Sequence, residues 1–180
     1  MDSVAIFWLQ ILVSLGVFSL VTVWYVWPRL TKLPLNSVLT PLAWVQVFRY
    51  VGMTLLVKGF VDPRLNHHDL VITAYGDLVA ATLFLASILA LRINWRGAIP
   101  LVWVANTWGV VDLLNAVRSA IESTLPDYHL ASFWWVYVLF APMVIVSHIA
   151  IYIALCKSRT WKQVTVPDQV TDSEKVTVSG

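Results

Sequence analysis

Long apolar runs separated by short polar breaks dominate the pattern along this chain. A helix that spans a membrane needs about 20 mostly apolar residues, because it must cross about 30 Å of hydrocarbon. The runs are also too continuous for the alternating strands of a membrane barrel. The pattern therefore predicts an all-α, polytopic membrane protein with five transmembrane helices, at residues 3–27, 33–57, 70–91, 97–117 and 130–156.

Basic residues gather in the breaks on one side of this predicted bundle, after the first, third and fifth runs. They are Arg29, Lys32, Arg92, Arg96, Lys157, Arg159 and Lys162. The positive-inside rule makes this side cytoplasmic, so we expect the N-terminus outside and the C-terminus inside. Residues 1–161 are expected to form the transmembrane domain, and the polar residues 162–180 a mobile cytoplasmic tail. Aromatic belts are expected at both interfaces, with Trp24, Tyr25 and Trp27 inside and Phe133, Trp134, Trp135 and Tyr137 outside.

The composition narrows the class of protein further. Of the 180 residues, 59% are hydrophobic and 12% are charged, about half the charged share of an ordinary soluble domain. The net charge is +2, and a single cysteine, Cys156, excludes an internal disulfide. These values exclude a disordered protein, a nucleic-acid binder and almost any cytosolic enzyme. The expected partners are the lipid bilayer, a lipid-like ligand, and a second copy or another membrane subunit; no motif indicates a cofactor.

Polar side chains inside the predicted spans are costly in hydrocarbon, so they are the first candidates for a functional site. Arg49, Asp77 and Asp112 all lie about 8–12 Å below the expected outer surface, at about 1.5 Å per residue. Polar residues at one-turn spacing extend the expected cluster to Gln46, Arg49, Thr73, Asp77, Asp112 and Asn115. Two carboxylates against one guanidinium leave one surplus negative charge. Either one aspartate is protonated, or a cation or a hydrogen-bond-donating ligand completes the site. The alternative is that the cluster only holds the helices together.

A second polar layer is expected deeper in the membrane. Asn106 and His148 lie at similar distances from the inner ends of the fourth and fifth spans, so they are predicted to face each other. Counted along the helices, His148 lies one to two turns deeper than the carboxylates and beyond their hydrogen-bond reach.

Two outer loops carry residue types that bind metals. They are His67, His68, Asp69, Asp127 and His129. Histidine and carboxylate ligands suit zinc or copper, but the spacing matches no specific ligand motif. The alternative interpretation is that all five are ordinary solvated loop residues.

A set of short motifs runs through the second to fifth spans. The motifs are Phe48-Arg49-x-x-Gly52, Tyr75-Gly76-Asp77, Asn106-x-x-Gly109-x-x-Asp112-Leu113, and Ala141-Pro142 followed by His148. This set resembles the pattern of a group of small uncharacterised bacterial multi-spanning membrane proteins. The resemblance implies a bacterial inner-membrane setting and no particular activity.

Three functions fit these residues. The favoured hypothesis is a small integral membrane protein that binds an apolar or amphipathic ligand, or a membrane partner, with the polar cluster fixing the bundle. The second is a proton- or cation-coupled transporter subunit built around Asp77 and Asp112. The third is a membrane-embedded enzyme acting on a lipid or isoprenoid, with one aspartate as general acid and His148 as base; the predicted depth of His148 counts against it.

Overall fold

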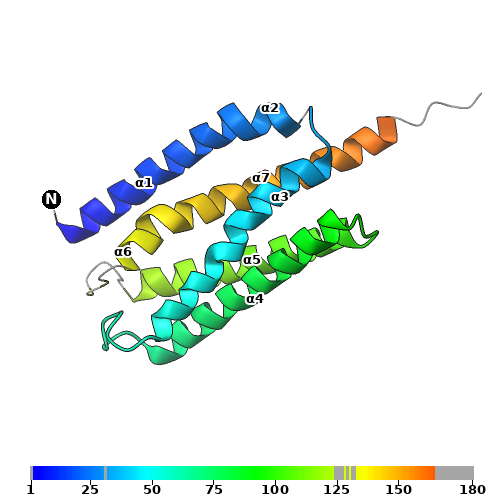
Figure 1. Cartoon of the computed structure of the whole chain (residues 1–180). Coiled ribbons are helices and arrows are strands. Elements are labelled where there is room, and N and C mark those ends of the chain that lie inside the picture. Colours follow the sequence, from blue (N-terminus) through cyan, green and yellow to red (C-terminus); the bar gives the residue numbers. More distant parts are fainter. Residues whose placement is uncertain (1, 31, 124–127, 129, 131–132, 165–180) are drawn as a thin grey trace, which may run out of the picture.

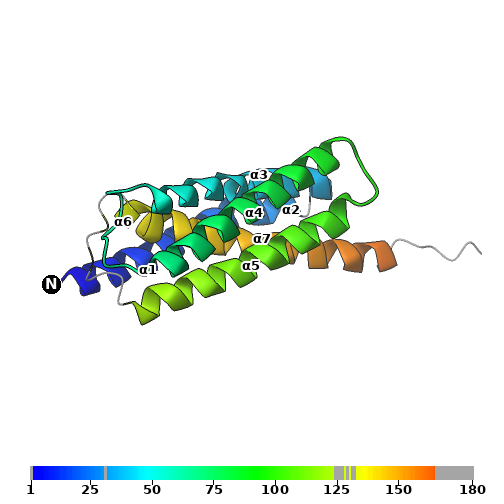
Figure 2. The same cartoon turned by 90° about the horizontal axis from the view of Figure 1, so that it is seen from below.

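The computed structural model of the chain describes residues 2–30, 32–123, 128, 130 and 133–164. Every regular element in this described part is helical and none is a strand, which confirms the predicted all-α class. The helical stretches run alternately in opposite directions along one another (Figures 1 and 2). Each of the five expected runs overlaps one such stretch, and four of the stretches extend beyond the expected bounds.

The stretches differ in how regularly they are wound. The first joins α1 (Ser3–Val21), the π-helical turn η1 (Thr22–Val26) and α2 (Trp27–Leu30), and the second joins α3 (Leu35–Val47) and the 3-10 segment η2 (Phe48–Leu56). The third and fourth are α4 (His67–Arg92) and α5 (Ala98–Glu122). The fifth joins α6 (Phe133–Trp135), the π-helical turn η4 (Val136–Phe140) and α7 (Ala141–Val164). The first residues of the expected polar tail therefore continue α7, and the rest of that tail lies outside the described residues.

Each π-helical turn lies just before a proline. Pro28 follows η1 and Pro142 follows η4. Proline lacks a backbone N–H, and its ring collides with the carbonyl four residues earlier in a regular helix. A π turn widens the helix at that point, so that the residue before the proline donates further back, as Ala141 does to the carbonyl of Val136. Both helices continue past their proline because of this local change in winding.

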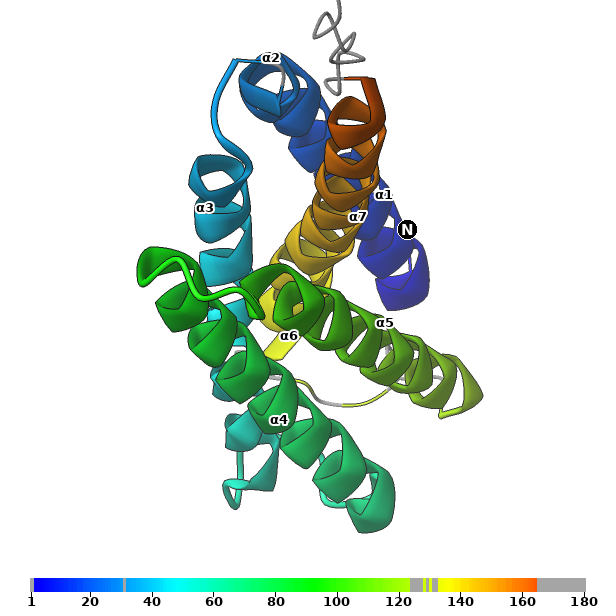
Figure 3. The ribbon, with the colours of Figure 1, turned by 90° about the vertical axis from the view of Figure 1, so that its right-hand side faces the viewer.

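The helix α7 lies between α1 and the remaining helices (Figure 3). The elements α3, α4, α5 and α7 pack on one another, whereas α1 packs against α7 and η4. Phe7 is the buried residue of α1. Most other apolar side chains of α1 face outward, including Leu12 at 65% exposure. The bundle is therefore four packed helices with a loosely attached fifth.

Two apolar cores are separated by a layer of buried polar side chains. The first core includes Phe84 and Ile151, and the second includes Leu55 and Phe133. The polar residues that lie between them along the helices are Gln46, Arg49, Asn106, Asp112, Ser147 and His148. Polar groups this deep require partners inside the protein, and their pairing defines the candidate site.

The loop before α4 is braced by its own contacts. Arg64 Nη2 lies 2.6 Å from Asp62 Oδ2, and the guanidinium stacks 5.1 Å from the ring centre of Tyr128. The hydrogen bond with Asp62 raises the pKa of Arg64, which therefore stays charged. Asn66 caps α4 by accepting from the backbone N–H of His68 at 3.0 Å.

Three stretches of the described residues are long and apolar enough to cross a membrane: Ser3–Arg29, His67–Arg92 and Phe133–Lys157. The two other expected spans do not meet both requirements, each for its own reason. The second changes from α to 3-10 winding after only 13 residues. The fourth, α5, has 25 residues but carries Asn106, Asp112 and Asn115, which lower its mean hydropathy.

Candidate functional site

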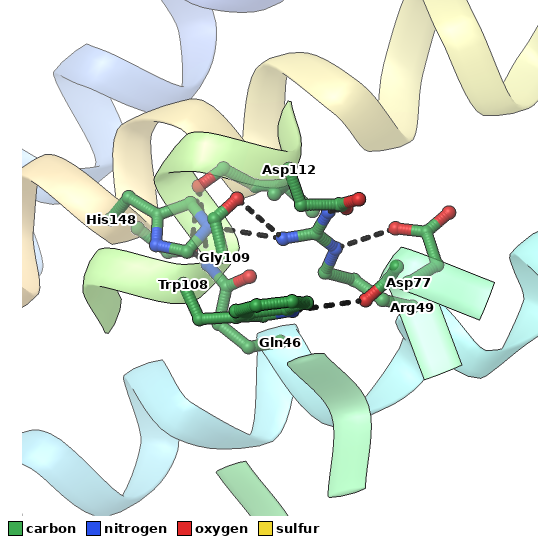
Figure 4. A network of polar contacts seen from close by, with 10 residues as sticks. Gln46, Arg49, Asp77, Trp108, Gly109, Asp112 and His148 are labelled. Carbon is green, nitrogen blue, oxygen red and sulfur yellow. Dashed lines mark hydrogen bonds and ion pairs between the residues drawn. The ribbon is translucent and has the colours of Figure 1, made fainter. Parts of the chain in front are cut away.

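A buried arginine joins four helical stretches at the centre of the polar layer (Figure 4). Arg49, on η2, is 3% exposed. Its Nε donates to Asp77 Oδ1 on α4 at 2.7 Å, and its Nη2 donates to Asp112 Oδ2 on α5 at 2.5 Å. Its Nη1 donates to the carbonyl of Gly109 at 3.0 Å and lies 3.4 Å from His148 Nε2 on α7. The structure thus brings together Arg49, Asp77 and Asp112, the three charged residues selected from the sequence by their predicted depth and by the energetic cost of a charge in hydrocarbon.

Three glycines make room for this cluster. They are Gly52 on η2, Gly76 on α4 and Gly109 on α5. The carboxylate of Asp77 fills the space where a side chain on the first would lie, and the carboxylate of Asp112 does the same at the second. A Cβ at the third would lie 2.6 Å from Cε1 of the His148 ring. Sequence reasoning missed the first and third of these glycines, although both belong to the motifs quoted above.

His148 reaches the cluster through Arg49 and forms no hydrogen bond with either carboxylate among the described residues; its partner Asn106 lies six residues before Asp112 on α5. The expected pairing with Asn106 is present: His148 Nδ1 lies 2.8 Å from Asn106 Oδ1, and Asn106 Nδ2 donates to the His148 carbonyl at 3.3 Å. Because an amide oxygen only accepts and a guanidinium only donates, the network places the ring proton on Nδ1 and leaves Nε2 to accept from Arg49. The lone pair that a general base would use is therefore occupied, which counts against the enzyme hypothesis.

Gln46 belongs to the polar layer but forms a separate set of hydrogen bonds. Its Nε2 donates to Ser147 Oγ at 2.5 Å and to the carbonyl of Val144 at 3.2 Å. Its Oε1 is buried and has no hydrogen-bond partner among the described residues. The amide thus ties α3 to α7 without a direct hydrogen bond to Arg49.

Two residues of the predicted cluster lie outside it. Asn115 Oδ1 accepts from the exposed Arg118 at 3.4 Å, so this amide faces away from Asp112. Thr73 forms no hydrogen bond with Asp77 in the described part of the chain, and it lines small cavities instead. Spacing along one helix was a poor guide here because it does not show which face meets a neighbour.

Two small cavities adjoin the cluster. The first has a volume of about 70 Å³ and is lined by Arg49, Asp77 and Tyr137 among others. The second, of about 30 Å³, is lined by Asp69 near the start of α4 and again by Tyr137. Tyr137 therefore turns inward, against the expectation of an outer aromatic belt, whereas Trp135 is 63% exposed. The first cavity thus places open space directly beside the Asp77 carboxylate, among mainly apolar side chains.

A larger groove of about 560 Å³ opens between the first helical stretch, α3 and α7. Its walls are mainly apolar and include Phe18, Val38, Val45 and Met143. Arg29 also lines it. The volume falls in the range of about 300–1,000 Å³ that is typical of small-molecule sites. No pattern in the sequence indicates this groove, because it arises from the loose attachment of α1.

The candidate metal ligands do not assemble in the described residues. His67, His68 and Asp69 form the first turn of α4, where both histidines are exposed. Asp127 and His129 lie outside the described residues. Within the residues that are described, no group of three His, Cys, Asp or Glu side chains is close enough to hold a metal ion.

Comparison with known proteins gives one match. The family model for a domain of unknown function, DUF8737, matches residues 6–156, which include most of every helical stretch and the whole polar layer. No curated protein and no solved structure matches the chain.

Proposed function

Since the chain belongs to the family of the domain of unknown function DUF8737, its own residues must indicate its chemistry, and we propose that it is an integral membrane protein that binds an anionic amphiphile. The observation that carries this proposal is the apolar groove between the first helical stretch, α3 and α7, with Arg29 in its lining. The ligand has an acyl chain along the groove and a phosphate or carboxylate head group beside the guanidinium.

The proposal places five spans in the membrane, two more than the three stretches that are long and apolar enough by themselves. Five antiparallel stretches of similar length form one bundle, and the outward face of α1 is apolar along its whole length. Arg29, Arg92 and Lys157 all lie at one end of the bundle, which supports a cytoplasmic position for this end. The motif resemblance described above supports the inner membrane of a bacterium.

Charge at the mouth of the groove supports an anionic ligand. Arg29 is exposed, and its Nη1 donates to the carbonyl of Tyr25 at 2.6 Å, which fixes the guanidinium while leaving other N–H groups to bind a ligand. Lys157, from α7, stacks 4.9 Å from the ring centre of Trp27 and brings a second positive charge to the same end. An acyl chain in the groove would cover Phe18, Val45 and other apolar walls that the protein leaves open.

The Arg49 cluster has a structural part in this proposal. Its hydrogen bonds join η2, α4, α5 and α7, whereas the first stretch packs on α7 and η4 and lies outside this network. A groove between these joined helices and a loosely attached one admits a chain-like ligand from the side, as lipid access requires.

Native mass spectrometry on protein purified in mild detergent tests this function. We expect a bound amphiphile in a fixed ratio with the wild-type protein. Val45→Trp fills the groove and should release the ligand, whereas the control Val104→Trp, at an exposed position on α5, should retain it. Arg29→Gln should weaken retention of anionic lipids more than Arg92→Gln. Equal retention by Val45→Trp and wild type would overturn the proposal.

A further inference from the structure

A polar stripe leads from the start of α4 to the buried cluster. Asp69, Thr73 and Asp77 are four residues apart, so they follow one face of α4. Ser119 and Ser123 are also four residues apart on α5, and both line the 30 Å³ cavity together with Asp69. The stripe therefore faces a polar surface of the neighbouring helix.

The two small cavities follow this stripe. The one of about 30 Å³ is lined by Asp69, and the one of about 70 Å³ is lined by Asp77. They share four lining residues: Leu55, Thr73, Ala116 and Tyr137. A water molecule needs about 10–15 Å³ of such space and two or more polar partners, so both cavities have room for water. Tyr137 stands at their junction, and its hydroxyl has no hydrogen bond to any described residue.

The opposite side of the cluster is closed. The core there is formed by Leu39, Phe84, Ile88, Ile151 and Leu155, each at most 1% exposed. Apolar side chains packed this tightly exclude water and offer it no polar partner. Among the described residues, the small cavities beside the cluster therefore lie on its Asp69 side and the close-packed core on the other.

One carboxylate oxygen of the cluster has no hydrogen-bond partner among the described residues. Asp77 Oδ1 accepts from Arg49, whereas Oδ2 lies over Gly52, a residue that lines the same cavity, and forms no hydrogen bond in the described part of the chain. The groups that face Asp77 are Arg49 from η2, Asp112 from α5 and Tyr137 from η4. His148, on α7, acts only through Arg49. One guanidinium against two carboxylates gives this set a net charge of −1.

We propose that Asp77 reversibly binds one proton, which reaches it from the Asp69 end along the two cavities past Thr73 and Tyr137. The transfer takes a proton from hydronium in the inner cavity to Oδ2 and leaves water and a neutral carboxyl group. The cluster then carries no net charge, which suits a site surrounded by apolar side chains. The proton site is separate from the groove, so it does not depend on the proposed function.

Infrared difference spectroscopy on the protein in nanodiscs, with rapid acidification, tests this inference. We expect the band of a protonated carboxyl group to appear in the wild type and to be absent in Asp77→Asn. Ala116→Leu fills both cavities and should slow the rise of the band by about tenfold or more, since a proton relay needs hydrogen-bond contact or a bridging water. Val111→Leu, which introduces the same residue type at a 61% exposed position of α5, should leave the rate unchanged.

Two outcomes would overturn the proposal. One is a band that disappears in Asp112→Asn and persists in Asp77→Asn; the other is an unchanged rate in Ala116→Leu. Thermal unfolding of each variant shows whether it is folded, and Ala116→Leu keeps the test valid if Asp77→Asn does not fold. Val45→Trp, which fills the groove and excludes its ligand, should leave the band unchanged, so failure of ligand binding and failure of proton binding are distinguishable.

Discussion

The carboxylate of Asp112, on α5, occupies the space that a side chain at Gly76 on α4 would need. One turn earlier on α5, Trp108 Nε1 donates to the carbonyl of Gly76 at 3.4 Å. The two contacts hold the α5 backbone close to α4 at the level where Arg49 joins both helices. The pairing of these helices therefore depends on a residue without a side chain as much as on the ion pair.

Gly76→Ala should destabilise the fold. The new methyl group would displace the Asp112 carboxylate from Arg49, and overpacking alone costs about 1–3 kcal/mol. The matched control is Gly16→Ala on α1, where an added Cβ meets nothing within 4 Å. Alanine is favoured over glycine in a helix by about 1 kcal/mol, so this control should be neutral or stabilising. Thermal unfolding in detergent measures both, and equal unfolding temperatures would contradict the role of the close approach.

Arg49→Met should be the most damaging single change in the cluster. It leaves two buried carboxylates without a partner, and breaking a buried ion pair in this way costs about 3–5 kcal/mol. The triple variant that adds Asp77→Asn and Asp112→Asn removes all buried charge and should recover part of this loss. Arg118→Met serves as the control, because its pair with Glu122 is exposed at 67% and 62% and is worth less than about 1 kcal/mol. Chemical unfolding in mixed micelles gives the free energy of unfolding of the wild type and the three variants. A triple variant less stable than Arg49→Met would contradict the view that unpaired buried charge causes the loss.

The ring of His148 should carry its proton on Nδ1. This tautomer donates to Asn106 Oδ1, 2.8 Å away, and accepts from Arg49 Nη1, 3.4 Å away. Nitrogen-15 NMR of protein labelled at histidine distinguishes the protonated ring nitrogen from the bare one. Asn106→Leu removes the acceptor and should shift the equilibrium toward the other tautomer. A wild-type spectrum with the proton on Nε2 would show that Arg49 does not donate to this ring.

Gln46→Leu should change stability little, although Gln46 is fully buried. Its Oε1 has no partner among the described residues, and loss of such an unpaired group offsets the loss of the Nε2 hydrogen bonds. Ser147 keeps a hydrogen bond to the carbonyl of Val144 at 3.0 Å in its absence. We expect a change within about 1 kcal/mol, smaller than for Arg49→Met. A loss comparable to that of Arg49→Met in the same unfolding measurement would mean that Gln46 supports the cluster directly.

The sequence predicts the helices and the charged residues of the site because both follow from the cost of polar groups among apolar ones. Arg49, Asp77 and Asp112 are charged residues in long apolar runs. Charged side chains in such surroundings pair with one another, so these three are expected to meet. The all-α class and the ion pairs of Arg49 can therefore be predicted from the composition and the pattern of apolar residues.

The contact between His148 and Arg49 could not be predicted in this way. Counting from Cys156 assumes that the fifth helix ends there and that every helix has the same rise per residue. In the structure α7 continues to Val164, and η4 and η2 have other windings. The count also leaves out the length of the Arg49 side chain, whose Nη1 lies 3.4 Å from His148 Nε2. Likewise, Tyr137 was assigned to a belt from its position near a helix end, although the direction of its side chain depends on the winding of η4.

The 3-10 winding of η2 has a consequence for how the protein responds to force along its axis. Three residues per turn stack Arg49, Gly52 and Leu55 in one line, and these are the buried residues of the segment. Rewinding its nine residues as an α-helix would shorten the segment by about 4.5 Å, because the rise falls from about 2.0 to 1.5 Å per residue. It would also turn Gly52 by about 60° away from Asp77. The contacts of Asp77 with Arg49 and Gly52 thus oppose such a shortening of the segment.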